Sequence, residues 1–349
     1  MDLDLKKTAD IEKWMLSKNI IHHYQIDEIL ELYNSESTNI LEDGRYILYS
    51  LIQNYKSKLY TTTLPDKYER LIGPISISYM KSTIYNKYIL LLGDTHAPVN
   101  PLCYRALKSI AIENWISQIL STNTKLIDVF VESGKQFEVK DDKGLSINKF
   151  QHSLESCFTS RKCSSRIHWV DVRKNLEELN HISNFLLDYN NNEKLEKVIA
   201  ILRNLNLKDI LEKSKIKKQF EGNKEIYSKY LEINIKFFED DYKNNIILNL
   251  ENVSTKNIGI LSLLEMMNFL MNFYTIGRIF KKVICKGYCP DPTFIICYFG
   301  KNHIDDIKSF LKEIMFEEVF NIDNSNISIL AKNVLNISNL PQPIFSDVN

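Results

Sequence analysis

Glycine and proline are scarce in this chain, with 10 and 8 among 349 residues. A phosphate-binding loop or a dinucleotide fingerprint needs several glycines within a short segment. Gly93, which ends an apolar segment, has no other glycine close behind it. Nucleotide binding of those two kinds is therefore disfavoured. The abundance of isoleucine, asparagine and lysine is typical of an AT-rich genome, so the asparagines by themselves indicate no particular structure.

An excess of either charge is also lacking, because Lys plus Arg and Asp plus Glu both number 44. No overall positive field exists to attract nucleic acid or an anionic membrane, so we expect neither as a partner. The first residues lack the basic-then-apolar order of a secretory signal. No uncharged apolar run reaches about 18 residues. The nearest, 261–283, contains Glu265 and Arg278 and predicts a buried helix, so we expect an intracellular protein.

The six cysteines lack the paired Cys-x-x-Cys spacing of zinc knuckles. Without a secretory signal, we expect free thiols in a reducing compartment. An alternative is a zinc cluster that combines Cys285 and Cys289 either with Cys297 or with Cys157 and Cys163. Cys297 lies within an apolar segment, where cysteine behaves as a small hydrophobic residue.

Four short apolar segments have the character of strands buried on both faces: 88–93, 126–132, 167–173 and 293–300. Helical spacing of apolar residues predicts helices at 102–120, 259–283 and 304–314. Strands that alternate with helices indicate βαβ units. We therefore predict an α/β fold with a central, largely parallel (mixed) sheet flanked by helices.

The chain divides into five segments by pattern. Residues 1–75 predict a helical N-terminal unit, and 76–173 the first half of the α/β core. Residues 174–255 are charged, rich in asparagine and helical in pattern, which indicates a helical insertion or cap. Residues 256–318 predict the second half of the core. The Asn/Ser/Pro-rich segment 319–349 predicts a loosely attached C-terminal tail.

Polar clusters follow each of the four predicted strands. They are Gly93-Asp94-Thr95-His96, Glu132, the group of His168, Asp171 and Arg173, and Gly300-Lys301-Asn302-His303. Singly, Asp94 could cap a helix, His96 could be structural and Glu132 could cap the next helix. Parallel strands end at one edge of a sheet, however, and ligands bind at that edge. Together the clusters predict one shared site there.

Arg278 lies in the middle of an otherwise apolar predicted helix. A buried guanidinium needs a partner, because an unpaired buried charge is costly. One alternative is an ion pair with Glu265 or another local acid. The other is a guanidinium that reaches the site and holds a carboxylate or an anionic transition state.

The order strand–Gly-x-x-His, strand–Glu, helix–Arg, strand–Gly-x-x-His resembles the superfamily of Tiki metalloproteases, TraB/PrgY proteins, ChaN-like haem-binding lipoproteins and erythromycin-esterase-like enzymes. The matching positions are Gly93, His96, Glu132, Arg278, Gly300 and His303. Outside the helical insertion, residues 73–315 also look like proteins of large DNA viruses, which implies the host cytoplasm or the virion. Asp94 stands where erythromycin-esterase-like members carry Glu.

The resemblance implies metal-dependent hydrolysis of a peptide or ester bond in a small-molecule or peptide substrate. His96, His303, Glu132 and Asp94 would hold one divalent transition metal, namely Mn, Fe, Co or Zn. Arg278 or His168 would stabilise developing negative charge, and Glu132 would share in catalysis. A metal-free variant would use one histidine as the general base.

Two other functions fit the same motifs. Asp94-x-His96 matches the first metal motif of calcineurin-like metallophosphoesterases, and Gly300 to His303 is similar to their Gly-Asn-His motif. The Gly-Asp-x-x-Asp and Gly-His-x-His blocks that complete their two-metal site are absent from this sequence. The second alternative is a catalytically silent binding or virion-associated protein that retains the fold.

Overall fold

The computed structural model describes residues 68–95, 108–122, 126–132, 150, 154, 165–214, 216–281, 293–327, 332–342, 344 and 345. Most of the expected N-terminal unit lies outside these residues. So do His96 and five of the six cysteines. The sixth, Cys297, is a buried free thiol whose pKa is raised by burial, which agrees with its assignment to the core.

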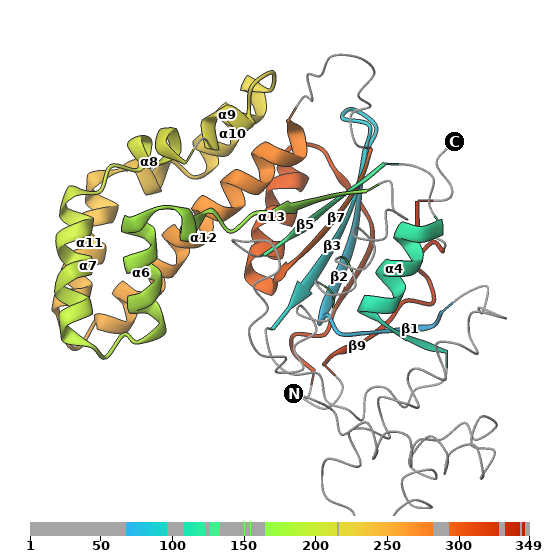
Figure 1. Ribbon diagram of the computed structural model, residues 1–349, viewed down its shortest axis with the longest axis horizontal. Coiled ribbons are helices and arrows are strands. Elements are labelled where there is room, and N and C mark those ends of the chain that lie inside the picture. The colour runs from blue at the N-terminus through green and yellow to red at the C-terminus, as the bar shows by residue number, and fades with distance from the viewer. Residues whose placement is uncertain are drawn as a thin grey trace, which may run out of the picture.

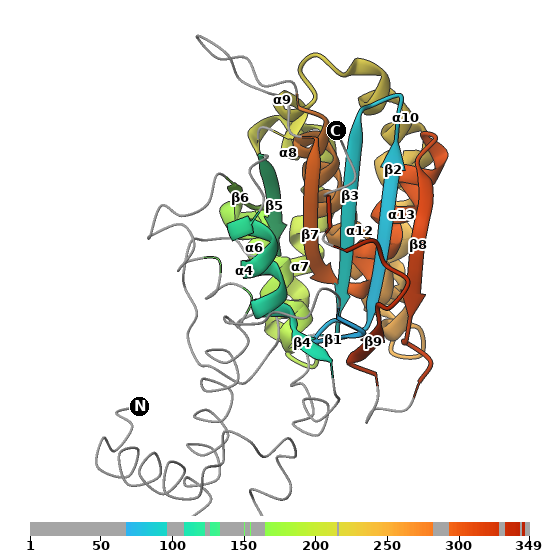
Figure 2. The ribbon, with the colours of Figure 1, turned by 90° about the vertical axis from the view of Figure 1, so that its right-hand side faces the viewer.

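A six-stranded sheet forms the centre of the molecule (Figures 1 and 2). Its strands are β2 (Ser76–Ser82), β3 (Lys87–Asp94), β5 (Ile127–Val131), β6 (Arg166–Trp169), β7 (Phe294–Gly300) and β8 (Glu317–Asp323). The spatial order is β6-β5-β7-β3-β2-β8. The four strands from β6 to β3 are parallel, whereas β2 and β8 are antiparallel to their neighbours. The predicted mixed, largely parallel α/β fold is confirmed.

The central strands are largely apolar because each of their faces meets a separate core. Leu91 of β3 and Cys297 of β7 contribute to one core, and Leu90 and Ile296 to the other. Alternate side chains of a strand point to opposite faces, so a strand covered on both sides lacks polar alternation. The result is a three-layer arrangement of helices, sheet and helices.

In the part of the chain that the structure describes, helices cover both faces of the sheet (Figure 1). On one face lie α12 (Lys256–Phe280) and α13 (Lys301–Glu313); on the other lies α4 (Ile112–Thr122). The helices predicted at 259–283 and 304–314 are thus confirmed. The helix predicted from residue 102 is wrong at 109–111, because these residues form the short strand β4 (Ser109–Ala111).

The expected insertion at 174–255 is helical wherever the structure describes it. It comprises the 3-10 helices η3 (Val172–Asn175) and η4 (Ile235–Phe238) and the helices α6 (Glu177–Leu187), α7 (Asn192–Asn204), α8 (Leu207–Lys213), α9 (Ile216–Gln219), α10 (Lys224–Ile233) and α11 (Asp240–Glu251). Figure 1 shows this helical unit beside the sheet. Stacked aromatic rings hold this unit to α12. The ring centroids of Phe237 and Phe269 are 4.6 Å apart, and those of Tyr230 and Phe273 are 4.8 Å apart. The helix α12 therefore belongs to both the helical unit and the core.

By length and composition α12 is apolar enough to cross a membrane. It packs instead between the helical unit and the sheet, with 61% of its most apolar window buried inside the protein. Such packing is typical of the core helix of a soluble protein, as the charged residues within the sequence segment predicted.

The C-terminal segment is not the loose tail that its composition predicted. β8 forms one edge of the large sheet, and β9 (Val334–Asn336) joins a second, three-stranded sheet of order β4-β1-β9. In that sheet β1 (Arg70–Ile72) lies inside the segment expected to be helical. Leu335 and Leu340 are fully buried in the core beneath α4. The isolated apolar residues of this polar segment fill that core.

Candidate functional site

The candidate site lies where β3, β5 and β7 end. Gly300 ends β7 and pairs in register with Asp94, the last residue of β3. Glu132 follows β5 on the other side of β7, and His303 lies in the first turn of α13. The structure therefore brings Asp94, Glu132, Gly300 and His303 to one edge of the sheet, because parallel strands share the edge at which they end.

Glu132 has a partner on each carboxylate oxygen. Its Oε2 accepts a 2.7 Å hydrogen bond from the backbone N–H of Gly300. Its Oε1 lies 3.4 Å from Nη2 of Arg173 and 3.4 Å from Nε2 of His303. The first bond places a negative charge beside the start of α13, where the helix dipole favours it. The Glu132 side chain thus binds the N-terminal end of α13, although Gly300, the N-cap of that helix, is 168 residues farther along the chain.

The structure places Arg173 at this edge of the sheet, beside Glu132 and Asp171. Its Nε donates a 2.7 Å hydrogen bond to Oδ1 of Asp171, and its Nη2 faces Glu132. Burial lowers the pKa of Arg173, but the carboxylates of Asp171 and Glu132 outweigh burial and raise it. The order of motifs in the sequence assigned Arg278 as the arginine of the site. Arg173 belongs to the polar cluster of the predicted strand 167–173, but the sequence patterns indicated no role of its own for it.

His303 is almost fully buried between α13 and α12. Its Nδ1 lies 2.7 Å from Oδ1 of Asn272, and Nδ2 of Asn272 donates a 2.9 Å hydrogen bond to Oδ2 of Asp306. Burial raises the pKa of the Asp306 carboxyl above its ordinary value, while the charge of His303 and the hydrogen bond from Asn272 oppose that rise. Asn272 lies within an apolar stretch of α12, so the sequence patterns did not indicate it.

Asp94 is 1% exposed, and its Oδ1 accepts a 2.9 Å hydrogen bond from the backbone N–H of Thr95. The expected ligand His96 follows two positions later and lies outside the described residues. Within the part of the chain that the structure describes, no group of three or more His, Cys, Asp or Glu side chains is close enough to hold a metal ion.

His168 and Arg278 form a separate network deeper along the sheet. Nη2 of Arg278 lies 2.7 Å from Nδ1 of His168, and Nη1 donates to Gln219 at 3.2 Å. Burial lowers the pKa of His168, and so its neutral ring can accept from Arg278. The expected partner Glu265 binds Lys236 instead. The structure thus gives Arg278 partners that neither sequence alternative named.

Asp128 completes this second network. Its carboxylate accepts two hydrogen bonds from Arg166, of 2.6 and 2.9 Å. Its Oδ2 lies 3.2 Å from Nε2 of His168, within ion-pair distance but without the alignment of a hydrogen bond. His168 also stacks on Phe130 at 4.6 Å. Because Phe130 precedes Glu132 by two residues, this network lies about 7 Å from the strand ends.

Gly93 allows three elements to pack closely. A Cβ atom at this position would lie 2.3 Å from Oγ of Ser76 and 3.3 Å from Cα of Lys301. Any larger residue would therefore push β2 or α13 away. Lys301 is held in turn by Asp305 and by Asp323, the latter at 2.9 Å. In this motif the glycine is required by packing of the protein itself.

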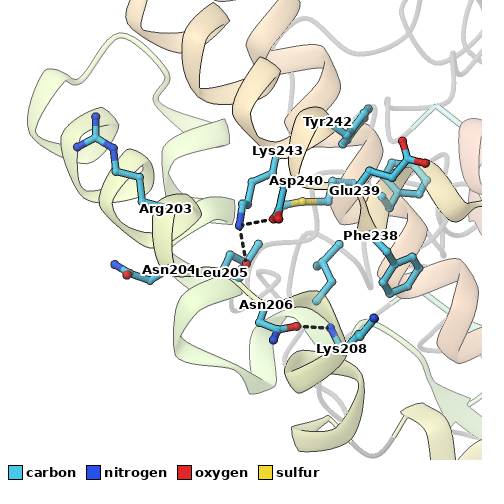
Figure 3. A pocket seen from close by; sticks show the side chains of 13 residues that line it. Arg203, Asn204, Leu205, Asn206, Lys208, Phe238, Glu239, Asp240, Tyr242 and Lys243 are labelled. Carbon is cyan, nitrogen blue, oxygen red and sulfur yellow. Dashed lines mark hydrogen bonds and ion pairs between the residues drawn. The ribbon is translucent and has the colours of Figure 1, made fainter.

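Another polar cavity, of about 310 Å³, lies within the helical unit (Figure 3). It is bordered by the connection from α7 to α8 and by the start of α11. Nζ of Lys243 lies 3.3 Å from both the carbonyl oxygen of Leu205 and Oδ1 of Asp240. The cavity is lined by charges of both signs, and its lining includes neither histidine nor cysteine. We assign the candidate site to the strand ends instead.

Comparisons of the chain with protein-family models, with curated proteins and with solved structures found no match in any of the three. The resemblance to the Tiki and TraB superfamily therefore stays a prediction from the motifs. The functional interpretation rests on the geometry of the residues at the strand ends.

Proposed function

We propose that this protein is a metal-dependent hydrolase of a peptide or ester bond, and that its site is the edge where β3, β5 and β7 end. One observation carries the proposal. Nε2 of the buried His303 faces Oε1 of Glu132 at 3.4 Å, and each side chain is fixed from behind by other hydrogen bonds.

This pair suits a transition metal. Bonds of about 2.0–2.2 Å to nitrogen and oxygen at a tetrahedral angle put two ligand atoms about 3.4 Å apart. Imidazole together with carboxylate suits Mn, Fe, Co or Zn. The described residues of this edge include three carboxylates, those of Asp94, Glu132 and Asp171, whose charge suits a divalent cation. His96 would add a ligand from the segment that follows β3.

A bound ion would supply Lewis acidity and a water molecule of lowered pKa. The protein's own groups have distinct roles around it. The backbone N–H of Gly300 and the guanidinium of Arg173 hold the Glu132 carboxylate in place. Arg173 also supplies a permanent positive charge that can stabilise an oxyanion on the substrate. The resemblance implied this charge-stabilising role for Arg278 or His168, and the proposal assigns it to Arg173 instead.

The first test is metal content. Protein incubated with Mn²⁺, Co²⁺ or Zn²⁺ and then desalted is expected to hold close to one ion per chain. His303→Ala and Glu132→Gln are expected to lose it, because the first removes the ligand nitrogen and the second replaces a charged carboxylate by a neutral, weaker ligand. His181→Ala is the matched control, since His181 lies on α6 with only Glu177 near its ring. Elemental analysis reads the result.

The second test is turnover on peptide, ester and phosphoester panels. Hydrolysis of peptides or esters that falls to background in His303→Ala supports the proposal. Full hydrolysis by His303→Ala contradicts it. Bound metal without turnover would identify a catalytically silent binding protein, and turnover of phosphoesters alone a phosphoesterase.

A further inference from the structure

We infer that Asn272 and Asp306 are positioning residues that set the tautomer of His303, so that the lone pair of its Nε2 faces Glu132. The inference rests on the proposed function, in which Nε2 of His303 is a metal ligand. Asn272 and Asp306 are not ligands themselves; they leave Nε2 of His303 unprotonated and able to bind an ion.

The first step is the orientation of the Asn272 amide. Asp306 lies one turn after His303 on α13, and its Oδ2 is 2.9 Å from Nδ2 of Asn272. An ionised carboxylate can only accept hydrogen bonds, so the amide nitrogen must face it. The amide oxygen of Asn272 is then turned towards His303.

The second step is the position of the imidazole proton. Oδ1 of Asn272 lies 2.7 Å from Nδ1 of His303, a normal hydrogen-bond length. An amide oxygen can only accept, so Nδ1 of His303 must carry the proton and donate it. A neutral imidazole carries one such proton, and its Nε2 therefore presents a lone pair.

The third step is what this lone pair faces. Nε2 of His303 lies 3.4 Å from Oε1 of Glu132, within ion-pair distance but without the alignment of a hydrogen bond, so two acceptor atoms lie close together. That arrangement is unfavourable alone and becomes favourable when a cation lies between them. The opposite tautomer would donate its Nε2 proton to Glu132 and occupy the position of the ion. Asn272 thus keeps the proton away from Nε2 of His303, so that the position beside Glu132 is left for an ion.

The placement of Asn272 agrees with such a role. It is 1% exposed between Met271 and Phe273, which are both fully buried, so its amide loses its contacts with water. A buried amide is costly unless hydrogen-bonded, and both ends of this amide are bonded to α13. A second hydrogen bond that orients a metal-binding histidine is a common support of such sites.

The test is a direct reading of the tautomer. Protein labelled with ¹⁵N-histidine, free of metal and in mildly alkaline buffer, gives long-range proton–nitrogen correlations that separate the two ring nitrogens. Loss of signals in His303→Gln assigns His303 among the seven histidines. The wild type is expected to carry its proton on Nδ1. Asn272→Ala is expected to move it to Nε2, because Glu132 is then the remaining acceptor.

The exchange Asn272→Asp with Asp306→Asn is the matched rescue. It keeps an acceptor facing Nδ1 of His303 and a donor facing residue 272, so the Nδ1 proton is expected to return. Zn²⁺ affinity, measured separately, is expected to fall about 10–100-fold in Asn272→Ala and to recover in the exchange. A merely structural role would lower stability without moving the proton.

The inference is overturned if the wild-type ring carries its proton on Nε2, a result that needs no folded variant, or if Asn272→Ala leaves the proton on Nδ1. The reading requires neither metal nor turnover. An Nδ1 proton in a protein that binds no metal would therefore reject the proposed function while the tautomer assignment stands.

Discussion

Asp128 shows how one buried carboxylate can organise charged neighbours that have no part at the strand ends. It is 2% exposed in β5, yet it accepts two hydrogen bonds from Arg166 and approaches His168. Burial raises the pKa of Asp128, but its neighbours His168 and Arg166 together outweigh burial and lower it. Its ionised form therefore stabilises the folded chain.

Asp128→Asn is expected to lower the free energy of unfolding by about 2–3 kcal/mol at neutral pH, because Arg166 loses a charged partner. This figure is at the lower end for a broken buried pair, since Arg166 is 33% exposed. The pKa of Asp128 is lower when folded than when unfolded. The stabilisation is thus present above about pH 4 and is lost as pH falls through the folded value.

Urea denaturation of both proteins between about pH 7 and pH 3 measures this effect. The gap between wild type and Asp128→Asn should narrow on acidification. Glu251→Gln, which removes the exposed partner of Arg203, is the control and should show no measurable gap. A gap that stays constant across this pH range would mean that the Asp128 charge does not contribute.

Single residues also mark how far the sequence could predict the site. Asp94, Glu132 and His303 were predictable because each follows an apolar strand, and parallel strands share an edge. The assignment of Arg278 relied on a family order of motifs, whereas its partner is decided by which face of α12 it occupies. Asn272 gave no signal, because one amide inside an apolar helix does not change its periodicity.

At the scale of elements, α12 connects the two polar networks. Asn272 lies at the strand ends, and Arg278 lies six residues later, about 9 Å farther along the helix axis. Phe280, at its end, contacts Tyr85 in the turn between β2 and β3, at the other end of the sheet. The helix therefore runs antiparallel to β3 and holds both networks at a fixed spacing.

Gly277 is a position where α12 packs closely against its neighbours. A Cβ atom there would lie 2.6 Å from the ring of Phe220 and 2.8 Å from Cβ of Gln219. Alanine is normally better than glycine within a helix by about 1 kcal/mol. Gly277→Ala is nevertheless expected to destabilise the protein by about 1–3 kcal/mol, because Phe220 is buried and cannot move aside.

Thermal or urea denaturation reads this change. Asn257→Ala, at an exposed position of the same helix, is the comparison and should be neutral or slightly stabilising. Stabilisation by Gly277→Ala as well would show that α9 can move away from α12 without cost.

Three of the elements that the sequence analysis missed are short, whereas β2 and β8, which it also missed, have seven residues each. β1, β4 and β9 each have three residues, and a stretch of that length contains too little alternation to indicate a strand. They exist because they pair with each other, through contacts between residues up to 266 positions apart, as in Arg70 with Asn336. β3, β5 and β7 were predictable because burial on both faces makes them apolar over five or more residues.

At the scale of the whole molecule, the C-terminal segment completes the core beneath α4. Gln342 donates to the carbonyl oxygen of Tyr68 and accepts from its N–H. Leu340→Ala is expected to cost about 3 kcal/mol, since Leu340 is fully buried. Ile327→Ala, which changes an exposed side chain of the same segment, should cost little. Equal stability of the two variants would show that the segment does not support the core.

The strand order also has a consequence for biosynthesis. β7 lies between β5 and β3, so the two strands made early cannot be joined until residues 294–300 have been translated. At about 5–20 residues per second, the roughly 200 residues that follow β3 take some 10–40 s. During that interval the unpaired strand edges of the nascent chain must be kept from other chains. The helical unit, whose contacts are local, can fold on the ribosome meanwhile.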